Sequence, residues 1–535
     1  MKKIPLSLAA LLLYLGIASL YFGMGVLPHL STRLAGFEND PLLFTWIFSW
    51  WAFAMTHGLN PLWSTYVWAP HGMSIANMTA IPSLAIPLIP LTKLFGALVS
   101  YNLCAIYLSA LSAWSAYFLC RHLTKQFFAA LVGGMLFGFS TYQIGQELGG
   151  HLNLLATGLL PLFVLLIMKW VEDLLSTKRF ILWFTLCMVI QLGLSRELLL
   201  TSTISGVLTW LWGYYLYPDF RVKLRLLALR ILLCFIIAMI ITSPYWVTFI
   251  THMPTLSYPP PYEQLGVTTQ PLNFIVPTPI TGVNLPALSH QYWHWFYVFY
   301  AYQIENGSYI GLPLFVLFLW HTIRHWKQTG KLYLPLFLLC AILSLGWTFT
   351  WGRTLYTHIL LPGSLLYFVP LLSKVLLIRL SVFLWLLLAI VTAIWLASPS
   401  KYKILKWLWV GLSMVCIAPS FSFAHRPWYQ KGAYQTQIPA TGIITAFAYP
   451  DLALPMLWQL NSHFRFKLTM AYTGTYPKDQ DAAWSYLIAG KPLPPLEKKQ
   501  LLVQLGKTDL WGDIGGINQI KQNLVKAPIK AHLVE

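Results

Sequence analysis

The chain has 535 residues, of which 57% are hydrophobic, 16% are aromatic and only 10% are charged, and its mean hydropathy is +0.62. An ordinary soluble domain carries about 25% charged residues, so this composition excludes a soluble enzyme. The net charge of +19 would suggest nucleic-acid binding in a soluble protein. Here most lysines and arginines lie in short loops between apolar segments, which is typical of the cytoplasmic loops of a membrane protein, and we expect no nucleic-acid partner.

Apolar segments long enough to cross a bilayer recur along the chain, since a hydrocarbon core of about 30 Å needs roughly 20 residues per helix. With the basic loops placed in the cytoplasm, the sequence predicts eleven spans and a cytoplasmic N-terminus. The spans cover about 5–26, 100–120, 126–142, 153–170, 180–198, 202–217, 226–250, 307–323, 332–350, 376–397 and 404–424. Residues 81–96 are not counted because Pro82, Pro87 and Pro90 interrupt them, and a twelfth span stays open.

Eleven spans place the C-terminus outside, so we expect a transmembrane domain over 1–424 and an extracytoplasmic domain over 425–535. In the second, alternating patterns predict strands at 442–448 and 464–472, and an amphipathic pattern predicts a helix at 496–505. The expected fold is an all-α polytopic membrane protein of about eleven helices with a small C-terminal α/β domain.

Two long loops are expected on the outer side, at 27–99 and 251–306. The first is rich in tryptophan, and its segment 41–55 predicts a helix lying in the membrane interface, where tryptophan is favoured. Loops of this length in a compact protein are usually functional, so we expect the chemistry on the outer face.

The candidate catalytic residues are Asp40, Glu197 and His151, because few ionisable groups face outward and such groups are costly near the membrane. Each has a structural alternative. Asp40 precedes Pro41 and suits a helix N-cap, Glu197 suits a structural ion pair, and His151 suits a hydrogen-bonded core position. Glu305 is a candidate substrate-binding residue that suits a helix cap equally well.

Arginines near the outer leaflet form a second group of candidates. Arg196, Arg353 and Arg379 break the positive-inside pattern, so each needs an anionic partner. The guanidinium group binds phosphate in a bidentate manner, which favours a lipid phosphate or a phosphorylated carrier. Snorkelling to ordinary headgroups is the alternative.

Several motifs are missing from the sequence. It has no phosphate-binding loop of ATPases, no dinucleotide-binding glycine motif, no H-E-x-x-H and no cysteine pair at metal spacing, so an ATP-driven pump is not expected. No metal site is predicted, although a divalent cation, Mg²⁺ or Mn²⁺, stays open as a cofactor if Asp40, Glu197 and His151 converge.

Several local strings lie in the outer loops, spans and C-terminal segment: Asn-Asp-Pro at 39–41, His-Gly-Leu-Asn-Pro at 57–61, Pro-His-Gly at 70–72, Phe-Gly-Phe-Ser-Thr-Tyr at 137–142, Gly-His-Leu-Asn-Leu at 150–154, Glu305 with Tyr-Ile-Gly-Leu-Pro at 309–313, Met-Leu-Trp-Gln at 456–459 and Phe-Arg-Phe at 464–466. With the first outer loop, its acidic residue and the many spans, they resemble the GT-C superfamily of integral-membrane glycosyltransferases, in a bacterial branch. These strings also carry His57 and Asn153, which we expect to contact substrate.

The resemblance implies an inner-membrane enzyme that moves a sugar from a polyprenyl-phosphate carrier to a glycan, lipid or protein acceptor, with Asp40 as the base. A single displacement would invert the anomeric carbon. Two other hypotheses stay open. One is a transporter or flippase of lipid-linked saccharide, and the other is a non-catalytic assembly factor for envelope polysaccharide.

Overall fold

The computed structural model describes most of the chain. The described residues are 5–36, 39–252, 256–257, 269–278, 280–282, 305, 307–351, 354–368, 375–420, 438–448, 452–473, 476–477, 487, 495, 498, 509–523 and 531–534. The chain folds into two compact units. Unit 1 comprises Met1–Leu27, Cys104–Ile240 and Pro260–Arg426, and unit 2 comprises Pro28–Leu103, Ile241–Pro259 and Pro427–Glu535.

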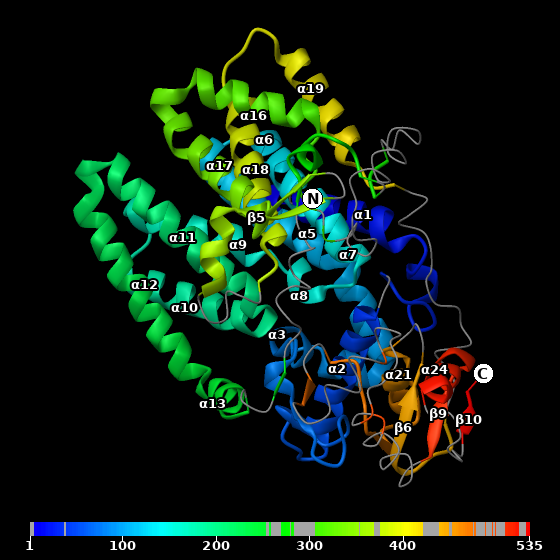
Figure 1. The fold of residues 1–535 in the computed structure, drawn as a ribbon. Coiled ribbons are helices and arrows are strands. Elements are labelled where there is room, and N and C mark those ends of the chain that lie inside the picture. The colour runs from blue at the N-terminus through cyan, green and yellow to red at the C-terminus, as the bar shows by residue number, and fades with distance from the viewer. Residues whose placement is uncertain are drawn as a thin grey trace. The chain divides into compact units, whose positions relative to one another are not determined.

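In the residues that the structure describes, unit 1 is helical apart from one hairpin (Figure 1). Its helices are α1 (Leu6–Ala18), α5 (Ala97–Thr124, which begins in unit 2), α6 (Phe127–Gly138), α7 (Thr141–Leu148), α8 (Leu152–Leu155), α9 (Leu159–Val171), α10 (Thr177–Leu194), α11 (Arg196–Leu216), α12 (Arg221–Ile241), α16 (Leu312–Arg324), α17 (Lys331–Ser344), α18 (Ser381–Ala397) and α19 (Lys403–Ile417). The hairpin pairs β4 (Thr348–Trp351) with β5 (Thr354–Leu360) in antiparallel fashion.

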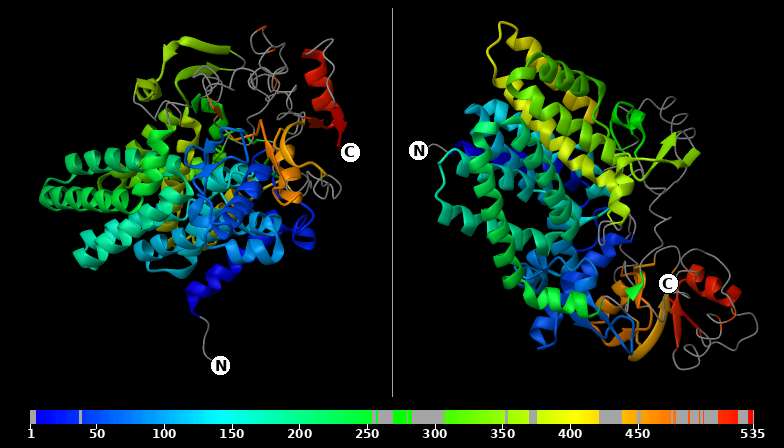
Figure 2. Two further views of the ribbon diagram at one scale, coloured as in Figure 1. Left: turned by 90° about the horizontal axis from the view of Figure 1, so that it is seen from below. Right: turned by 60° about the vertical axis from the view of Figure 1, so that its left-hand side comes forward.

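The core of unit 1 forms around α18, which packs against α6, α16 and α17. Figure 2 shows α16, α17, α18 and α19 side by side. Helix α18 is buried along most of its length, and Trp385 is fully buried. Where α6 crosses α5, a Cβ at Gly138 would meet the backbone of Ala113, so only glycine allows this close approach.

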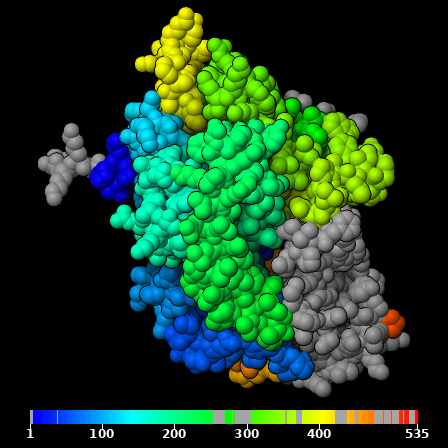
Figure 3. All heavy atoms as spheres, turned by 90° about the vertical axis from the view of Figure 1, so that its left-hand side faces the viewer, coloured from blue at the N-terminus to red at the C-terminus, as the bar shows by residue number. Residues whose placement is uncertain are grey.

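Seven helical segments in the described part of the chain are long and apolar enough to cross a membrane. They are Leu6–Gly23, Ala97–Thr124, Phe127–Leu148, Leu152–Val171, Thr177–Leu194, Pro218–Ile241 and Leu377–Ala397. Each matches one of the spans expected from the sequence. Figure 3 shows the exposed face formed by α12, where Val222, Leu229 and Ile240 are 61–71% exposed, as suits a helix that faces lipid.

The other four expected spans correspond to α11, α16, α17 and α19, and the total of eleven stays a prediction. Helix α11 has 21 residues but does not count among the seven. Helices α16, α17 and α19 have 13, 14 and 15 residues, shorter than a full crossing needs. The interrupted segment at 81–96 forms two short helices, α3 (Pro82–Ala85) and α4 (Ile89–Phe95), as its prolines predict.

Unit 2 combines the first long loop with the C-terminal segment. Strands β6 (Gly442–Phe447), β7 (Phe466–Leu468), β9 (Leu510–Gly512) and β10 (Ala531–Leu533) form a parallel sheet of order β10-β9-β6-β7. Helices α21 (Leu454–Asn461) and α24 (Ile514–Asn523) accompany it. Strands β6 and β7 lie where alternation predicted them, and the helix expected at 496–505 lies almost entirely outside the described residues.

Unit 2 also contains two short strand pairs and a further helix. Strands β1 (Trp63–Ser64) and β2 (Met73–Ser74) pair in antiparallel fashion, and so do β3 (Leu256–Ser257) and β8 (Tyr476–Pro477). Helix α13 covers Ser243–Thr251.

Helix α2 (Asp40–Thr56) is the helix expected at 41–55, but it is a core helix. Twelve of its residues are buried, on every side of the helix. Trp46 donates from Nε1 to Gln459 Oε1 at 2.8 Å, and Trp51 donates to Ala80 O at 2.9 Å. Protein groups rather than lipid headgroups therefore satisfy the N–H groups of these tryptophans, and the interfacial position of the helix stays a prediction.

Candidate functional site

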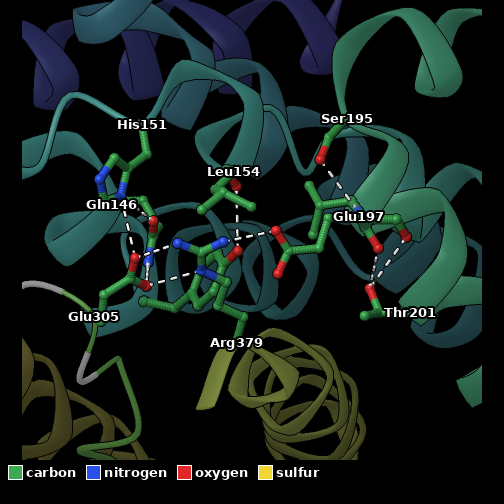
Figure 4. Close-up of polar contacts among 10 residues, drawn as sticks. Gln146, His151, Leu154, Ser195, Glu197, Thr201, Glu305 and Arg379 are labelled. Atoms are coloured by element: carbon green, nitrogen blue, oxygen red, sulfur yellow. Dashed lines mark hydrogen bonds and ion pairs between the residues drawn. The ribbon is translucent and has the colours of Figure 1, made fainter. Parts of the chain in front are cut away.

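Five polar side chains from separate segments of unit 1 meet in one cluster (Figure 4). Gln146 lies on α7, His151 immediately precedes α8, and Glu197 lies in the first turn of α11. Arg379 belongs to a short 3-10 helix, Leu377–Leu380, that leads into α18, and Glu305 lies in the segment before α16. We call this set the Arg379 cluster.

Arg379 bonds to both carboxylates of the cluster. Its Nη1 donates to Glu197 Oε2 at 2.6 Å, its Nε donates to Glu305 Oε2 at 3.0 Å, and its Nη2 donates to Glu305 Oε1. The side chains of Glu305, Arg379 and Glu197 are 5%, 16% and 20% exposed. The contact with Glu305 is a bidentate fork, which is the strong geometry for a guanidinium and a carboxylate.

Gln146 and His151 extend the network. Gln146 Nε2 donates a hydrogen bond to Glu305 Oε2 at 3.1 Å. The amide oxygen of Gln146, Oε1, is then available to accept a hydrogen bond. His151 Nδ1 lies 2.8 Å from that oxygen and 3.6 Å from Glu305 Oε1. The network therefore assigns the proton of a neutral His151 to Nδ1, because the amide oxygen needs a donor.

The charges in the Arg379 cluster do not balance. Burial by itself would raise the pKa of Glu305, but the Arg379 charge and its hydrogen bonds, with His151 and Gln146, outweigh burial and lower the pKa to about 2. One guanidinium faces two carboxylates, so with a neutral His151 the cluster has a net charge of −1. Among the described residues, Glu197 Oε1 is buried and has no hydrogen-bond partner.

Local backbone features hold the two carboxylates in place. Extended Ser195 ends α10 and caps α11 by accepting a bond from Leu198 N at 3.2 Å, which puts Glu197 in a first turn, where an acid is favoured. Two residues after Glu305, the carbonyl of Gly307 accepts bonds from Trp385 Nε1 and Thr141 Oγ1 at 3.0 and 3.2 Å. A Cβ at Gly307 would collide with the α7 backbone.

Glu147, next to Gln146 on α7, has a different environment. It is 3% exposed, yet within the described ranges its carboxyl group makes no hydrogen bond or ion pair. The two adjacent residues of α7 thus differ sharply: Gln146 belongs to the Arg379 cluster, and Glu147 does not.

The structure gives Arg379 carboxylate partners. From the sequence, a donor phosphate was the preferred anion, with Glu305 or ordinary headgroup contact as the alternative. In the structure, Glu305 and Glu197 accept hydrogen bonds from all three nitrogens of the guanidinium, through three of its five N–H groups. The physical reason is that a buried cation needs a permanent counter-ion, and the fold supplies two carboxylates from distant segments.

Asp40 belongs to unit 2 and begins α2. The N-cap alternative is wrong, because Asn39 occupies the N-cap position and no side-chain capping bond is made. Asp40 Oδ1 instead accepts a hydrogen bond from the hydroxyl of Tyr472 at 2.9 Å. Tyr472 lies in the C-terminal segment, and no pattern in the sequence linked it to the first loop.

Four further residues were expected to contact substrate: His57, Asn153, Arg196 and Arg353. His57 follows α2 on an exposed surface, with Nδ1 2.8 Å from Phe53 O. Asn153 lies on the short α8, and Arg196 is the first residue of α11. Arg353 lies outside the described residues.

The carboxylates of the Arg379 cluster, Glu197 and Glu305, do not fit a metal site. In the part of the chain that the structure describes, no group of three or more histidine, cysteine, aspartate or glutamate side chains is placed to hold a metal ion. Glu197 and Glu305 both already bond to Arg379, so a guanidinium stands where a cation would be held.

Comparison with known proteins gives a likeness in fold. No family model matches the chain, and no curated protein matches it. Thirteen chains of solved structures match. One is the crystal structure of the Archaeoglobus fulgidus oligosaccharyltransferase in complex with Zn and sulfate, which has a TM-score of 0.50 and 12% identity over 87% of this chain and 62% of that chain. Its apo form has a TM-score of 0.40 and 10% identity over 87% and 64%.

This chain therefore spans less than two thirds of the length of those two chains. At 12% identity the likeness shows a shared fold alone. It agrees with the expectation of a largely helical membrane protein.

Proposed function

We propose that this chain is a membrane glycosyltransferase that moves a sugar from a polyprenyl-phosphate carrier to a glycan, lipid or protein acceptor on the extracytoplasmic side. The observation that carries the proposal is the fold likeness to an oligosaccharyltransferase over 87% of this chain. The extracytoplasmic side follows from the positive-inside rule, which puts the first loop and its Asp40 outside.

Asp40 is the proposed general base. Its carboxylate accepts the proton of the acceptor hydroxyl while the acceptor oxygen attacks the anomeric carbon of the donor. The bond from that carbon to the phosphate oxygen breaks, and its electron pair leaves on the phosphate. The carrier phosphate is already a good leaving group, so one base and cations near the phosphate are sufficient for the step. A single displacement inverts the anomeric carbon.

The Arg379 cluster has a supporting role in this proposal. Because Arg379 is committed to Glu197 and Glu305, it orders the segments that carry them and does not bind the carrier phosphate. His151 and Glu197 remain the proposed helpers that orient substrate. Arg196 and Arg353 remain the proposed phosphate contacts, and His57 and Asn153 remain proposed substrate contacts. No step passes through a metal ion.

A carrier-release assay tests the proposal. The full chain is placed in lipid nanodiscs with polyprenyl-phosphate hexoses and an extract of envelope lipids, and released polyprenyl phosphate is measured by mass spectrometry. Asp40→Asn keeps the size of the side chain and an acceptor oxygen for Tyr472, so its melting temperature should stay unchanged. Loss of the base should lower release by about 100-fold or more.

Asp219→Asn is the matched control, because Asp219 is exposed and lies in a loop expected in the cytoplasm. It should release carrier at the wild-type rate. If no hexose donor yields free carrier, or if Asp40→Asn works at the full rate, the proposed function or its base is wrong.

A further inference from the structure

The C-terminal segment contacts the first loop within unit 2 through a series of hydrogen bonds. Leu468 N donates to Tyr66 O at 2.9 Å, and Ala69 N donates to Leu468 O at 2.8 Å. Trp68 Nε1 donates to Thr473 Oγ1 at 3.0 Å, with both residues buried. These bonds lie on both sides of Tyr472, so its backbone is fixed against the first loop.

The same segment also holds the start of α2. Asn39 Oδ1, one residue before Asp40, accepts a hydrogen bond from Ala453 N at 2.8 Å. Helix α21, which follows Ala453, packs on α2. One part of the C-terminal segment thus bonds to the side chain of the residue before Asp40, and another bonds to the Asp40 carboxylate, through the Tyr472 hydroxyl at 2.9 Å.

We infer that Tyr472 is a positioning residue for the Asp40 carboxylate, so the C-terminal segment completes the catalytic site. This inference rests on the proposed function, in which Asp40 is the base. An aspartate carboxylate rotates about two side-chain bonds. A donor on Oδ1, held by a fixed backbone, restricts both rotations and sets the direction in which the carboxylate receives a proton.

The chemistry of the contact supports orientation over proton transfer. The tyrosine hydroxyl donates one hydrogen bond to the carboxylate oxygen and keeps its proton throughout the reaction. A hydrogen bond to a charged acceptor is about twice as strong as one between neutral groups, which suits it to hold a base in place. Misplacing a reacting group by about 1 Å can cost about 100-fold in rate, so the expected effect is on turnover.

Tyr472→Phe removes the hydroxyl and keeps the ring. In the carrier-release assay, we expect kcat to fall by about 10- to 100-fold while the donor KM changes less than about twofold. Thr469→Val is the matched control. It lies on the same segment and loses the buried bond to Thr445 Oγ1 of β6 at 3.0 Å, which is not one of the bonds that hold Tyr472 against the first loop. It should lower the melting temperature and keep kcat near the wild-type value.

The inference predicts that Tyr472→Phe has no further effect on an Asp40→Asn background, because the two residues act as one unit. A Tyr472→Phe enzyme with kcat within about twofold of wild type would overturn the inference and leave Asp40 as the base. An equal loss of kcat in Thr469→Val would also overturn it, because the segment would then act through the fold alone. A fully active Asp40→Asn enzyme is a different result, which refutes the proposed function itself.

Discussion

Replacing Arg379 by methionine is the sharpest test of the cluster in unit 1. Methionine preserves much of the apolar volume of the side chain but removes the cation. The change leaves Glu197 and Glu305, 20% and 5% exposed, without the guanidinium that bonds to both of them. Two carboxylates facing each other in a buried site repel, and each loses its counter-ion.

The size of the loss follows from burial. Two unit charges 4 Å apart attract by about 4 kcal/mol at an effective dielectric constant of about 20, and Arg379 has two such partners. Part of this attraction offsets the desolvation of the three groups. Breaking a buried ion pair by removing one partner costs about 3 to 5 kcal/mol. In a large unit each kcal/mol lowers the melting temperature by about 2 °C, so we expect a fall of about 6 to 10 °C.

The assay is thermal unfolding of the full chain in nanodiscs, followed by intrinsic fluorescence. A neutral variant, Glu197→Gln with Glu305→Gln and Arg379→Met, removes all three charges and should recover at least half of the loss, because no unpaired charge remains. Glu147→Gln is the matched control, since within the described ranges that buried carboxyl group has no partner. It should not lower the melting temperature.

Two results would refute this reasoning. The first is a melting temperature for Arg379→Met within about 2 °C of wild type, which would mean that the ion pairs are not stabilising. The second is a neutral triple variant less stable than Arg379→Met, which would mean that the loss comes from packing and not from charge.

Three further predictions concern pH, packing and topology. The pKa of Glu305 is about 2, against an ordinary 4.5. The ionised Glu305 therefore contributes about 3 kcal/mol to the free energy of unfolding above pH 4.5, and this contribution is lost as the pH falls toward 2. Melting curves should show this acid dependence in wild type and not in Glu305→Gln, and equal curves would contradict it. Gly307→Ala should lower the melting temperature by several degrees, because the new Cβ collides with the backbone of α7. Gly16→Ala should not lower it, because a Cβ at Gly16 has no atom within 4 Å. Equal melting temperatures for the two variants would refute the packing argument. An alkaline phosphatase fused after Glu535 should be active outside the cell, and activity of a cytoplasmic reporter alone would end the outward assignment of Asp40.

Sequence patterns predicted several helices, strands and unusual charged residues of this chain. Runs of about 20 apolar residues located seven helices of the described chain that are long and apolar enough to cross a membrane, because hydropathy is a local property that tertiary contacts do not change. The same patterns predicted strands at 442–448 and 464–472, where β6 and β7 form. They also marked Glu197, His151, Glu305 and Arg379 as unusual, because ionisable groups near a membrane are costly wherever they lie.

Sequence patterns did not show which of these groups bond to one another. Arg379 is 182 residues from Glu197 and 74 residues from Glu305 along the chain, and no local pattern links them. Gln146 was not selected either, because a neutral amide carries no signal of its own until a carboxylate and an imidazole are placed on its two sides.

The sequence by itself determined that the chain is helical and apolar enough for the membrane, where most of its long helices run and which few charges need explaining. The tertiary structure alone decided what those charges do. It gave Arg379 two carboxylate partners where a phosphate was expected, buried α2 in a protein core, and joined Asp40 to Tyr472 across 432 residues. The physical reason is that hydropathy acts residue by residue, whereas hydrogen bonds and ion pairs require atoms within about 3 Å, and only the folded backbone brings such distant atoms together.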